Sequence, residues 1–238
     1  MNQPLREEYL GRVRERLAEG PLLDAAFDCL LPRAARSKST LHWTPVAVAR
    51  LAARRLAEHG ASRVLDAGSG PGKFCTLAAS ACPTLTFIGI ERRAELVFAA
   101  QELAAELQLV NAHFEVGDAL LRSWAEFDGF YFFNPFAEDA LRLRDAGGGK
   151  AQPRFAPQAL QLALRLREAR LGSVLITYHG LGGPIPSSYQ LKGEESTGTG
   201  RLRTWIKTTD KEQAWCHLDE GGVSRVAWSW LEQGRPQA

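Results

Sequence analysis

The stretch that most constrains the fold runs from Arg63 to Phe74 and reads RVLDAGSGPGKF. It begins with a short apolar run that ends at Asp66, which is typical of a buried strand. Three glycines follow at alternate positions, and glycine allows a backbone to turn tightly and to approach a ligand closely. A helical pattern begins directly afterwards, so the turn would present helix N-terminal amides to that ligand. The stretch therefore predicts a strand, a loop and a helix that bind a nucleotide-like molecule.

The spacing of the glycines narrows the choice of ligand. A dinucleotide-binding loop of the pattern G-x-G-x-x-G would need glycine at position 73, where this chain has Lys73. Asp66 lies two residues before the first glycine, and its carboxylate favours a cationic group on the ligand. A nicotinamide-dependent oxidoreductase is therefore disfavoured. A flexible turn in another α/β protein is the alternative for this loop taken alone.

The pattern Asp66-x-Gly68-x-Gly70-x-Gly72 resembles the first motif of class I S-adenosylmethionine-dependent methyltransferases. The resemblance covers residues 44–208. It implies that the loop wraps the methionine part of S-adenosylmethionine, with Asp66 near the amino group of the cofactor. The other loop residues in the expected cofactor site are Gly68, Ser69, Gly70, Gly72 and Lys73.

Thr44-Pro45 predicts the start of a helix that runs to about His59 and stops at Gly60. Thr44 is expected to be the N-cap, with Pro45 at the first helical position. This capping role is slightly favoured. The resemblance implies a second role, in which the helix covers the cofactor and Thr44 belongs to the cofactor site.

A second apolar strand, residues 86–91, ends in Glu91. A carboxylate at the carboxyl end of this strand suits hydrogen bonds to two ribose hydroxyls. The resemblance implies that Glu91 binds the ribose of the cofactor, and the following residue, Arg92, is included in the expected site. A surface acid beside two arginines is the alternative for Glu91.

A third short strand, residues 112–116, is followed by Gly117-Asp118-Ala119. The resemblance implies that Asp118 accepts a hydrogen bond from the adenine amino group, while the amide of Ala119 meets a ring nitrogen. A carboxylate can accept such a bond from an exocyclic amine. Taken alone, Gly117-Asp118 indicates only a turn. His113 within the strand is expected to pack rather than to act.

The fourth strand, residues 128–133, is nearly all aromatic, which suits burial on both faces. Asn134-Pro135-Phe136 follows it, at the sheet edge where functional residues gather. The segment partly resembles the N-P-P-Y/F motif of amino-group methyltransferases, although the second proline is missing, and the corresponding segment of seven-strand protein-lysine methyltransferases. Asn134 and Phe136 are therefore catalytic candidates, and Asn134 is also counted in the cofactor site. A proline-containing strand exit is the alternative.

His179 follows the predicted fifth strand, residues 172–178, and is the third catalytic candidate because it lies at the same edge. Residues 189–192 and 202–208 predict an antiparallel pair, which matches the last two strands of the resembled sheet. The predicted fold class is α/β: a doubly wound, mostly parallel seven-strand sheet with a terminal antiparallel hairpin strand and an N-terminal helical cap.

Three regions are expected along the chain. Residues 1–43 form the helical cap, with helices over 5–19 and 21–31. Residues 44–208 form the S-adenosylmethionine-binding methyltransferase domain. Residues 209–238, which contain Trp215, Trp228 and Trp230, form an extension packed on that domain.

Composition limits the setting in which the chain works. Its 238 residues carry a net charge of +2, which neither indicates nor excludes a nucleic-acid partner. The four cysteines form no C-x-x-C pair and match no zinc spacing, so reduced thiols and a cytoplasmic location are expected. No signal peptide and no membrane-spanning run is expected, and no resident metal.

The predicted function is transfer of a methyl group from S-adenosylmethionine to a nucleophilic acceptor. The sulfonium methyl is already electrophilic, so the protein mainly supplies alignment and a dry site. A nitrogen acceptor is favoured, with protein lysine slightly ahead of a nucleic-acid base, and a small molecule is the alternative. A non-catalytic module that binds S-adenosylmethionine and acts through a partner is a hypothesis of another class, because the binding residues would be the same.

Overall fold

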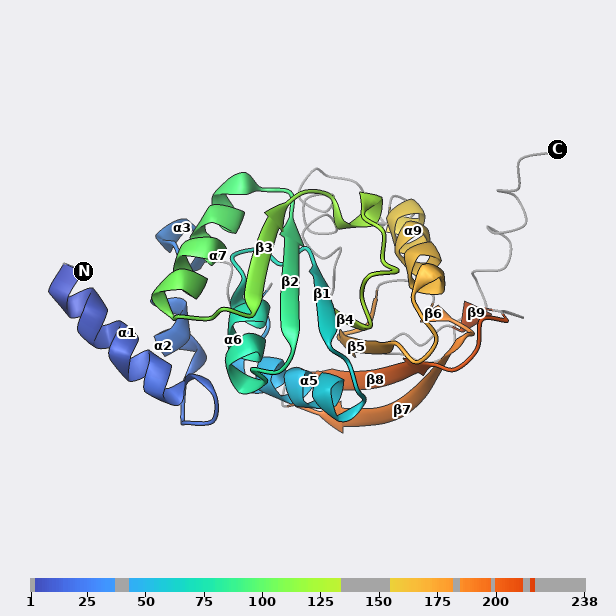
Figure 1. Cartoon of the computed structure of the whole chain (residues 1–238), viewed down its shortest axis with the longest axis horizontal. Coiled ribbons are helices and arrows are strands. Elements are labelled where there is room, and N and C mark those ends of the chain that lie inside the picture. Colours follow the sequence, from blue (N-terminus) through green and yellow to red (C-terminus); the bar gives the residue numbers. More distant parts are fainter. Residues whose placement is uncertain are drawn as a thin grey trace, which may run out of the picture.

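Seven strands form one sheet in the order β3-β2-β1-β4-β5-β8-β7 (Figure 1). The structure, a computed structural model, describes residues 3–36, 43–133, 155–181, 185–197, 200–211 and 215–216. The strands are β1 (Arg63–Ala67), β2 (Thr86–Glu91), β3 (Ala112–Val116), β4 (Gly129–Phe133), β5 (Val174–Tyr178), β7 (Tyr189–Ser196) and β8 (Arg201–Lys207).

The first five strands are parallel, and β8 runs antiparallel to both β5 and β7. The predicted fold class is therefore confirmed, including the antiparallel hairpin at the end of the chain. β7 is longer than predicted and continues to Ser196 past a register irregularity between Leu191 and Gly193. Because β1 to β5 are parallel, their carboxyl ends meet at one edge of the sheet.

Successive residues of each central strand point to opposite faces of the sheet, so two hydrophobic cores form. Val64 and Tyr131 face one core, whereas the neighbouring Leu65 and Phe130 face the other. The helices of the first core are α5 (Val46–Glu58), α6 (Lys73–Ala81) and α7 (Ala94–Glu106). The second core is covered by α9 (Phe155–Glu168) and the 3-10 helix η1 (Ala119–Leu121), as Figure 1 shows for α9.

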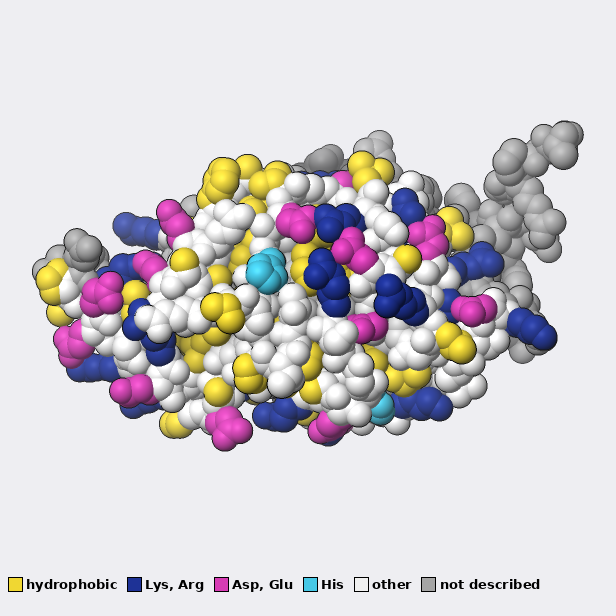
Figure 2. Space-filling model, viewed as in Figure 1, with side chains coloured by type: hydrophobic (Ala, Val, Ile, Leu, Met, Phe, Trp, Pro, Cys, Tyr) yellow, Lys and Arg dark blue, Asp and Glu magenta, His cyan; other side chains and the backbone are white. Residues whose placement is uncertain are grey.

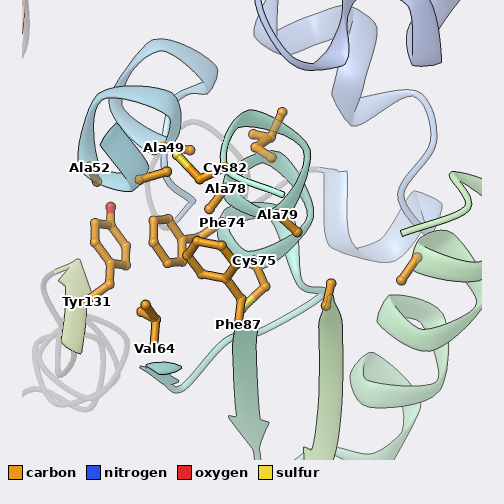
Figure 3. Packing of buried hydrophobic residues seen from close by; sticks show 14 of the residues in the cluster. Ala49, Ala52, Val64, Phe74, Cys75, Ala78, Ala79, Cys82, Phe87 and Tyr131 are labelled. Carbon is orange, nitrogen blue, oxygen red and sulfur yellow. The ribbon is translucent and has the colours of Figure 1, made fainter. Parts of the chain in front are cut away.

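The side chains of the first core interlock around α6. Figure 3 shows the ring of Tyr131 from β4 lying alongside the ring of Phe74 from α6. The two ring centroids are 3.7 Å apart and the planes are nearly parallel, at 8°. Phe87 of β2 meets Phe74 edge-on at 6.0 Å. The helix that begins at the glycine loop is thus held firmly against the sheet.

The N-terminal helices share this first core instead of forming a core of their own. They are α1 (Gln3–Leu17), α2 (Asp24–Asp28) and α3 (Arg33–Arg36), and they lie beside α6 and α7 (Figure 1). Leu10, Leu17 and Phe27 are each at most 2% exposed. Arg50 of α5 donates to carbonyl oxygens at the end of α1, including that of Leu17 at 2.9 Å. The second helix is shorter than the predicted 21–31, because the chain stays extended through Leu23.

The start of α5 differs from the prediction. Thr44 is not its N-cap; Pro45 takes that position, with an extended backbone. The hydroxyl of Thr44 instead shares a hydrogen bond of 2.8 Å with the hydroxyl of Tyr131 in the buried core. The first helical amide, that of Val46, donates to Asp24 Oδ1 at 2.9 Å. A carboxylate from α2 therefore caps α5 in place of the neighbouring threonine.

Two short strands lie outside the main sheet. β6 (Ile185–Pro186) pairs antiparallel with β9 (Trp215–Cys216), so the start of the C-terminal extension returns to the chain after β5. Trp228 and Trp230 lie outside the described residues. Of the helices that the structure describes, none is both long enough and apolar enough to span a bilayer.

Candidate cofactor and acceptor site

The glycine loop folds back over the end of β2. The amides of Gly68 and Ser69 donate to the carbonyl oxygen of Ile90 at 2.8 and 3.2 Å. The three alternate glycines have φ angles of +82°, +54° and +78°, a region that side chains other than glycine rarely adopt. The three alternate glycines therefore form a tight turn that is hydrogen-bonded to the neighbouring strand, β2.

The three glycines serve different purposes. A Cβ on Gly72 would lie 2.6 Å from the Phe114 ring and 2.7 Å from Ala100, so this glycine is required for packing. A Cβ on Gly68 would meet no atom of the described residues within 4 Å. A Cβ on Gly70 would meet only the indole nitrogen of Trp43, at 3.9 Å. The first two glycines thus border open space that a ligand can fill.

Asp66 is the acid at the end of β1, and it is 6% exposed. Burial raises the pKa of its carboxyl to about 7; the charge of Glu91 also raises it, while the Cys75 thiol, 3.5 Å away, lowers it. Among the residues that the structure describes, this carboxyl has no cationic partner, and an ammonium group on a ligand would supply one. The Ser69 side chain lies over Gly89 of β2, and its buried hydroxyl has no hydrogen-bond partner among the described residues.

Glu91 ends β2 and is joined to the glycine loop. Its Oε2 accepts from the amide of Gly70 at 3.1 Å, and its Oε1 accepts from Arg93 Nε at 2.9 Å. Burial acts to raise the pKa of Glu91, but the hydrogen bonds from Arg93 and Gly70 outweigh it and hold this pKa below its ordinary value. A carboxylate that is held ionised in this way can still accept hydrogen bonds from hydroxyl groups, because each of its oxygens has two lone pairs.

A hollow of about 160 Å³ lies next to Glu91 at the carboxyl ends of β1, β2 and β3. Asp118 lines it and caps η1 by accepting from the amide of Leu120 at 2.9 Å. Arg92 donates to the other oxygen of Asp118 at 2.5 Å. The hollow is lined by Ala67, Gly68, Ile90, Glu91, Arg92, Gly117, Asp118, Ala119, Leu120, Gln158 and Leu162.

Two groups of residues near the site were missed by the sequence analysis. Gln158 and Leu162 come from α9, which follows the fourth strand, and no motif indicates that this helix reaches the hollow. Trp43 lies beside the predicted helix start at Thr44-Pro45, but nothing in the sequence indicates that its indole lies near Gly70.

Lys73 has a different place from that expected of a cofactor residue. Its side chain is 3% exposed, and its ammonium group lies 2.7 Å from Asp24 and 2.7 Å from Asp28 of α2. Lys73, which stands where a dinucleotide-binding loop would need glycine, thus forms ion pairs with the N-terminal cap. His113, in turn, is exposed on β3 rather than packed as expected.

Aromatic side chains gather where β4 and β5 end. The rings of Phe133 and Tyr178 are 5.1 Å apart, and those of Tyr178 and His179 are 4.3 Å apart. His179 has a φ of +60°, and its ring fills the space in which a Cβ on Gly200 would lie. A left-handed backbone is uncommon for histidine and marks this turn as constrained. Asn134 and Phe136 lie outside the described residues.

The donor and acceptor groups suit S-adenosylmethionine. Asp66 offers a carboxyl to an ammonium group, Glu91 offers one to hydroxyls, and Asp118 borders a hollow large enough for a ring system. Gly68 and Gly70 leave the loop open to the ligand. The described residues hold no cluster of three or more His, Cys, Asp or Glu side chains that could hold a metal ion.

Comparison with known proteins gives the same assignment. Residues 58–147 match the family model described as a methyltransferase domain. A methyltransferase structure from Geobacter sulfurreducens aligns with a TM-score of 0.53 and 16% identity, over 86% of this chain and 98% of that chain. TrmN from Thermus thermophilus aligns with a TM-score of 0.51 and 19% identity, over 69% of this chain and 49% of that chain. No curated protein sequence matches the chain.

The two solved structures show that the fold is shared, and the family model assigns the activity to the region that carries the glycine loop and Glu91. The expectation drawn from the glycine motif is thereby confirmed at the level of the family. Residues 58–147 thus carry a methyltransferase domain, on a sheet with the strand order expected from the resemblance to class I, S-adenosylmethionine-dependent methyltransferases.

Proposed function

We propose that the chain methylates a nitrogen atom, with a lysine side chain of a protein as the favoured acceptor. The observation that carries this proposal is the aromatic group of Phe133, Tyr178 and His179 at the ends of β4 and β5. Aromatic rings exclude water from the group that they surround. Loss of water disfavours the charged form of an amine and so favours the neutral form, which is the form that attacks a methyl group.

The cofactor residues have separate roles in this proposal. Asp66 binds the amino group, Glu91 binds the ribose, and Asp118 with the amide of Ala119 binds the adenine. Gly68, Gly70, Gly72 and Ser69 form the loop around the methionine part, and Arg92 orients Asp118 through the bond between them. Thr44 contributes through the buried hydroxyl of Tyr131. The cofactor, when bound, supplies the electrophilic methyl group.

Three residues align the acceptor in this proposal. Asn134 directly follows Phe133 and accepts a hydrogen bond from the acceptor N–H, so that the nitrogen lone pair faces the methyl group. Phe136 forms an apolar wall beside it. His179 accepts the proton that a lysine ammonium must lose before it attacks. Alignment of this kind is the main contribution that a protein makes to methyl transfer.

Surface charge supports a protein or small-molecule acceptor over a nucleic acid. Figure 2 shows Lys and Arg side chains interspersed with Asp and Glu on the face in view, without a broad basic patch. Many arginines are also paired with acids, as in Arg122 with Glu126 at 2.9 Å and Arg55 with Glu195 at 2.7 Å. A nucleic-acid binder instead leaves basic side chains free to neutralise phosphates.

The experiment is methyl transfer from labelled S-adenosylmethionine to fractionated cell extract. Protein, RNA, DNA and small molecules are read separately, and labelled protein is hydrolysed to identify the modified amino acid. Label recovered as methyl-lysine supports the proposal. Label found only on oxygen or carbon atoms, or only in nucleic acid or small molecules, contradicts the favoured acceptor. Extract incubated with a Glu91→Ala variant is the control for transfer by other enzymes.

A further inference from the structure

Lys73 is a buried cation that forms ion pairs between the N-terminal cap and the methyltransferase domain. It is the first residue of α6, directly after the last glycine of the loop. Its ammonium group lies 2.7 Å from both Asp24 and Asp28, and 5.9 Å from the Phe27 ring. Both acids and the aromatic ring belong to α2. The cation therefore connects the N-terminal cap to the helix that begins at the cofactor loop.

Asp24 extends this connection to a third element. The same oxygen, Oδ1, that accepts from Lys73 also accepts from the amide of Val46 at 2.9 Å. That amide is the first of α5, and one carboxylate oxygen thus fixes the start of both α5 and α6. Two residues earlier, the hydroxyl of Thr44 is bonded to Tyr131 of β4 at 2.8 Å. The backbone around Pro45 is consequently held on both sides.

Trp43 lies at the end of this chain of contacts. Its indole nitrogen is 3.9 Å from the position that a Cβ on Gly70 would occupy, while the ring is partly buried against the first core. We propose that Lys73 is a positioning residue that holds α2 against the cofactor loop, and that Asp24 thereby sets Trp43 over Gly70 to close the cofactor site. The inference rests on binding of S-adenosylmethionine at this loop.

A role as a direct cofactor ligand does not suit Lys73. Two of its three donor positions are directed at carboxylates of α2, and the side chain is almost completely buried. Buried ion pairs seldom add much net stability, because removing the charges from water offsets their attraction. They are better suited to fixing a geometry, and the geometry fixed here is the approach of Trp43 to the loop.

The test is the affinity for S-adenosylhomocysteine, measured by calorimetry, which needs no methyl acceptor. The variants are Lys73→Met, Trp43→Ala and the double variant. We expect each single change to weaken binding about tenfold and the double change by no more than about twentyfold, because both remove the same closure. Lys73→Arg, which can still bridge the two acids, should restore much of the affinity.

Arg14→Met is the matched control. Arg14 also fastens the cap to the domain, through the carbonyl oxygen of Glu106 at 3.0 Å, but it has no bond to Asp24. This variant should lower the melting temperature and leave the affinity for S-adenosylhomocysteine unchanged. If Lys73→Met does not fold, Asp24→Asn, which removes the carboxylate that joins the lysine to the start of α5, replaces it in the same cycle.

Two results would overturn the proposal. One is a folded Lys73→Met variant that binds S-adenosylhomocysteine as tightly as the wild type. The other is a double variant whose loss is the product of the single losses, about a hundredfold, because independent sites act additively in free energy. A wild-type protein that binds no S-adenosylhomocysteine would overturn the cofactor assignment itself, whereas failure to find a nitrogen acceptor would leave these binding results unaffected.

Discussion

In the proposed function, Asp66 is expected to make cofactor binding depend on pH. Its carboxyl has a pKa raised by burial to about 7, against an ordinary value of 3.8. The ammonium group of the cofactor favours the ionised carboxylate, so binding below pH 7 must release a proton. We expect affinity to rise by up to about tenfold per pH unit as the pH approaches 7, and then to level off.

Calorimetry in two buffers of different ionisation enthalpy measures this proton release directly. Asp66→Asn should bind more weakly and lose the pH dependence. The stability of the ligand-free protein should change in the opposite direction and fall as the pH rises. A raised pKa in the folded state contributes stability that is complete below the ordinary value of 3.8 and is lost as the pH rises through about 7. A pH-independent affinity between pH 5 and 8 would show that Asp66 does not meet the ammonium group.

Asn134 is expected to act on turnover and not on cofactor affinity. In the proposed function its side chain aims the acceptor nitrogen, and one or two lost orienting hydrogen bonds reduce a rate by about tenfold to a hundredfold. Asn134→Ala should therefore bind S-adenosylhomocysteine nearly as well as the wild type. Single-turnover rates with the identified acceptor provide the measurement, and normal turnover would remove Asn134 from the mechanism.

At the scale of elements, two glycines of the loop have different expected roles: Gly70 in ligand binding and Gly72 in packing. A Cβ on Gly70 would meet only the indole nitrogen of Trp43, at an ordinary contact distance of 3.9 Å, so Gly70→Ala should cost only about 1 kcal/mol of stability for its left-handed φ. A Cβ on Gly72 would overlap Phe114 and Ala100, so Gly72→Ala should cost at least about 2 kcal/mol more. Denaturant unfolding with and without S-adenosylhomocysteine distinguishes the Gly70→Ala variant from the Gly72→Ala variant.

We expect Gly70→Ala to lose the stabilisation that the ligand gives, and Gly72→Ala to be unstable with or without it. Gly60→Ala is the control, because Gly60 also has a positive φ of +82° and a Cβ there meets no described atom, but it precedes β1 whereas the loop follows that strand. Equal losses of stability at positions 70 and 72 would show that the loop relaxes around either methyl group.

The sequence predicted those elements whose signals are local. Strands β1 and β2 each combine an apolar run with an acid at its end, and β3 is followed closely by Asp118, so their positions and the edge they share followed from residues close together in the chain. The contacts that were missed join distant residues. Asp24 caps α5 from twenty-two positions away, and Lys73 pairs with Asp28 from forty-five. No periodicity or motif records which carboxylate will meet which donor after folding.

The same limit explains the errors over Thr44 and His113. Threonine before proline is a common capping pattern, but here a hydroxyl partner on β4 and a carboxylate on α2 compete for the same positions. His113 occupies a strand at the edge of the sheet, and strand alternation alone does not tell which face a helix covers. In both cases tertiary packing decides between options that are locally equivalent.

At the scale of the whole molecule, the N-terminal cap is part of the core. Leu10, Val13, Leu17, Phe27, Leu30 and Leu31 are all at most 5% exposed within it. Each buried side chain of this size contributes about 1.5–3 kcal/mol. Their sum is comparable to the net stability of a whole domain, about 5–15 kcal/mol.

Deletion of residues 1–31 should therefore abolish cooperative unfolding rather than yield a smaller, active domain. Circular dichroism melting and gel filtration measure the result. Leu23→Ser in the full-length chain is the control, because Leu23 lies in the cap but is 77% exposed and should tolerate the change. A truncated protein that melts at the wild-type temperature would show that the cap is dispensable.

The reversed strand β8 sets the order in which a newly synthesised chain can complete its sheet. β7 leaves the ribosome before β8, yet within the sheet it pairs only with β8, and β8 alone joins it to β5. Until residues 201–207 have emerged, β5 presents an open edge to other nascent chains, which is a known route to aggregation. The hairpin must then dock as one unit, so completion of the sheet waits until β8 has been synthesised.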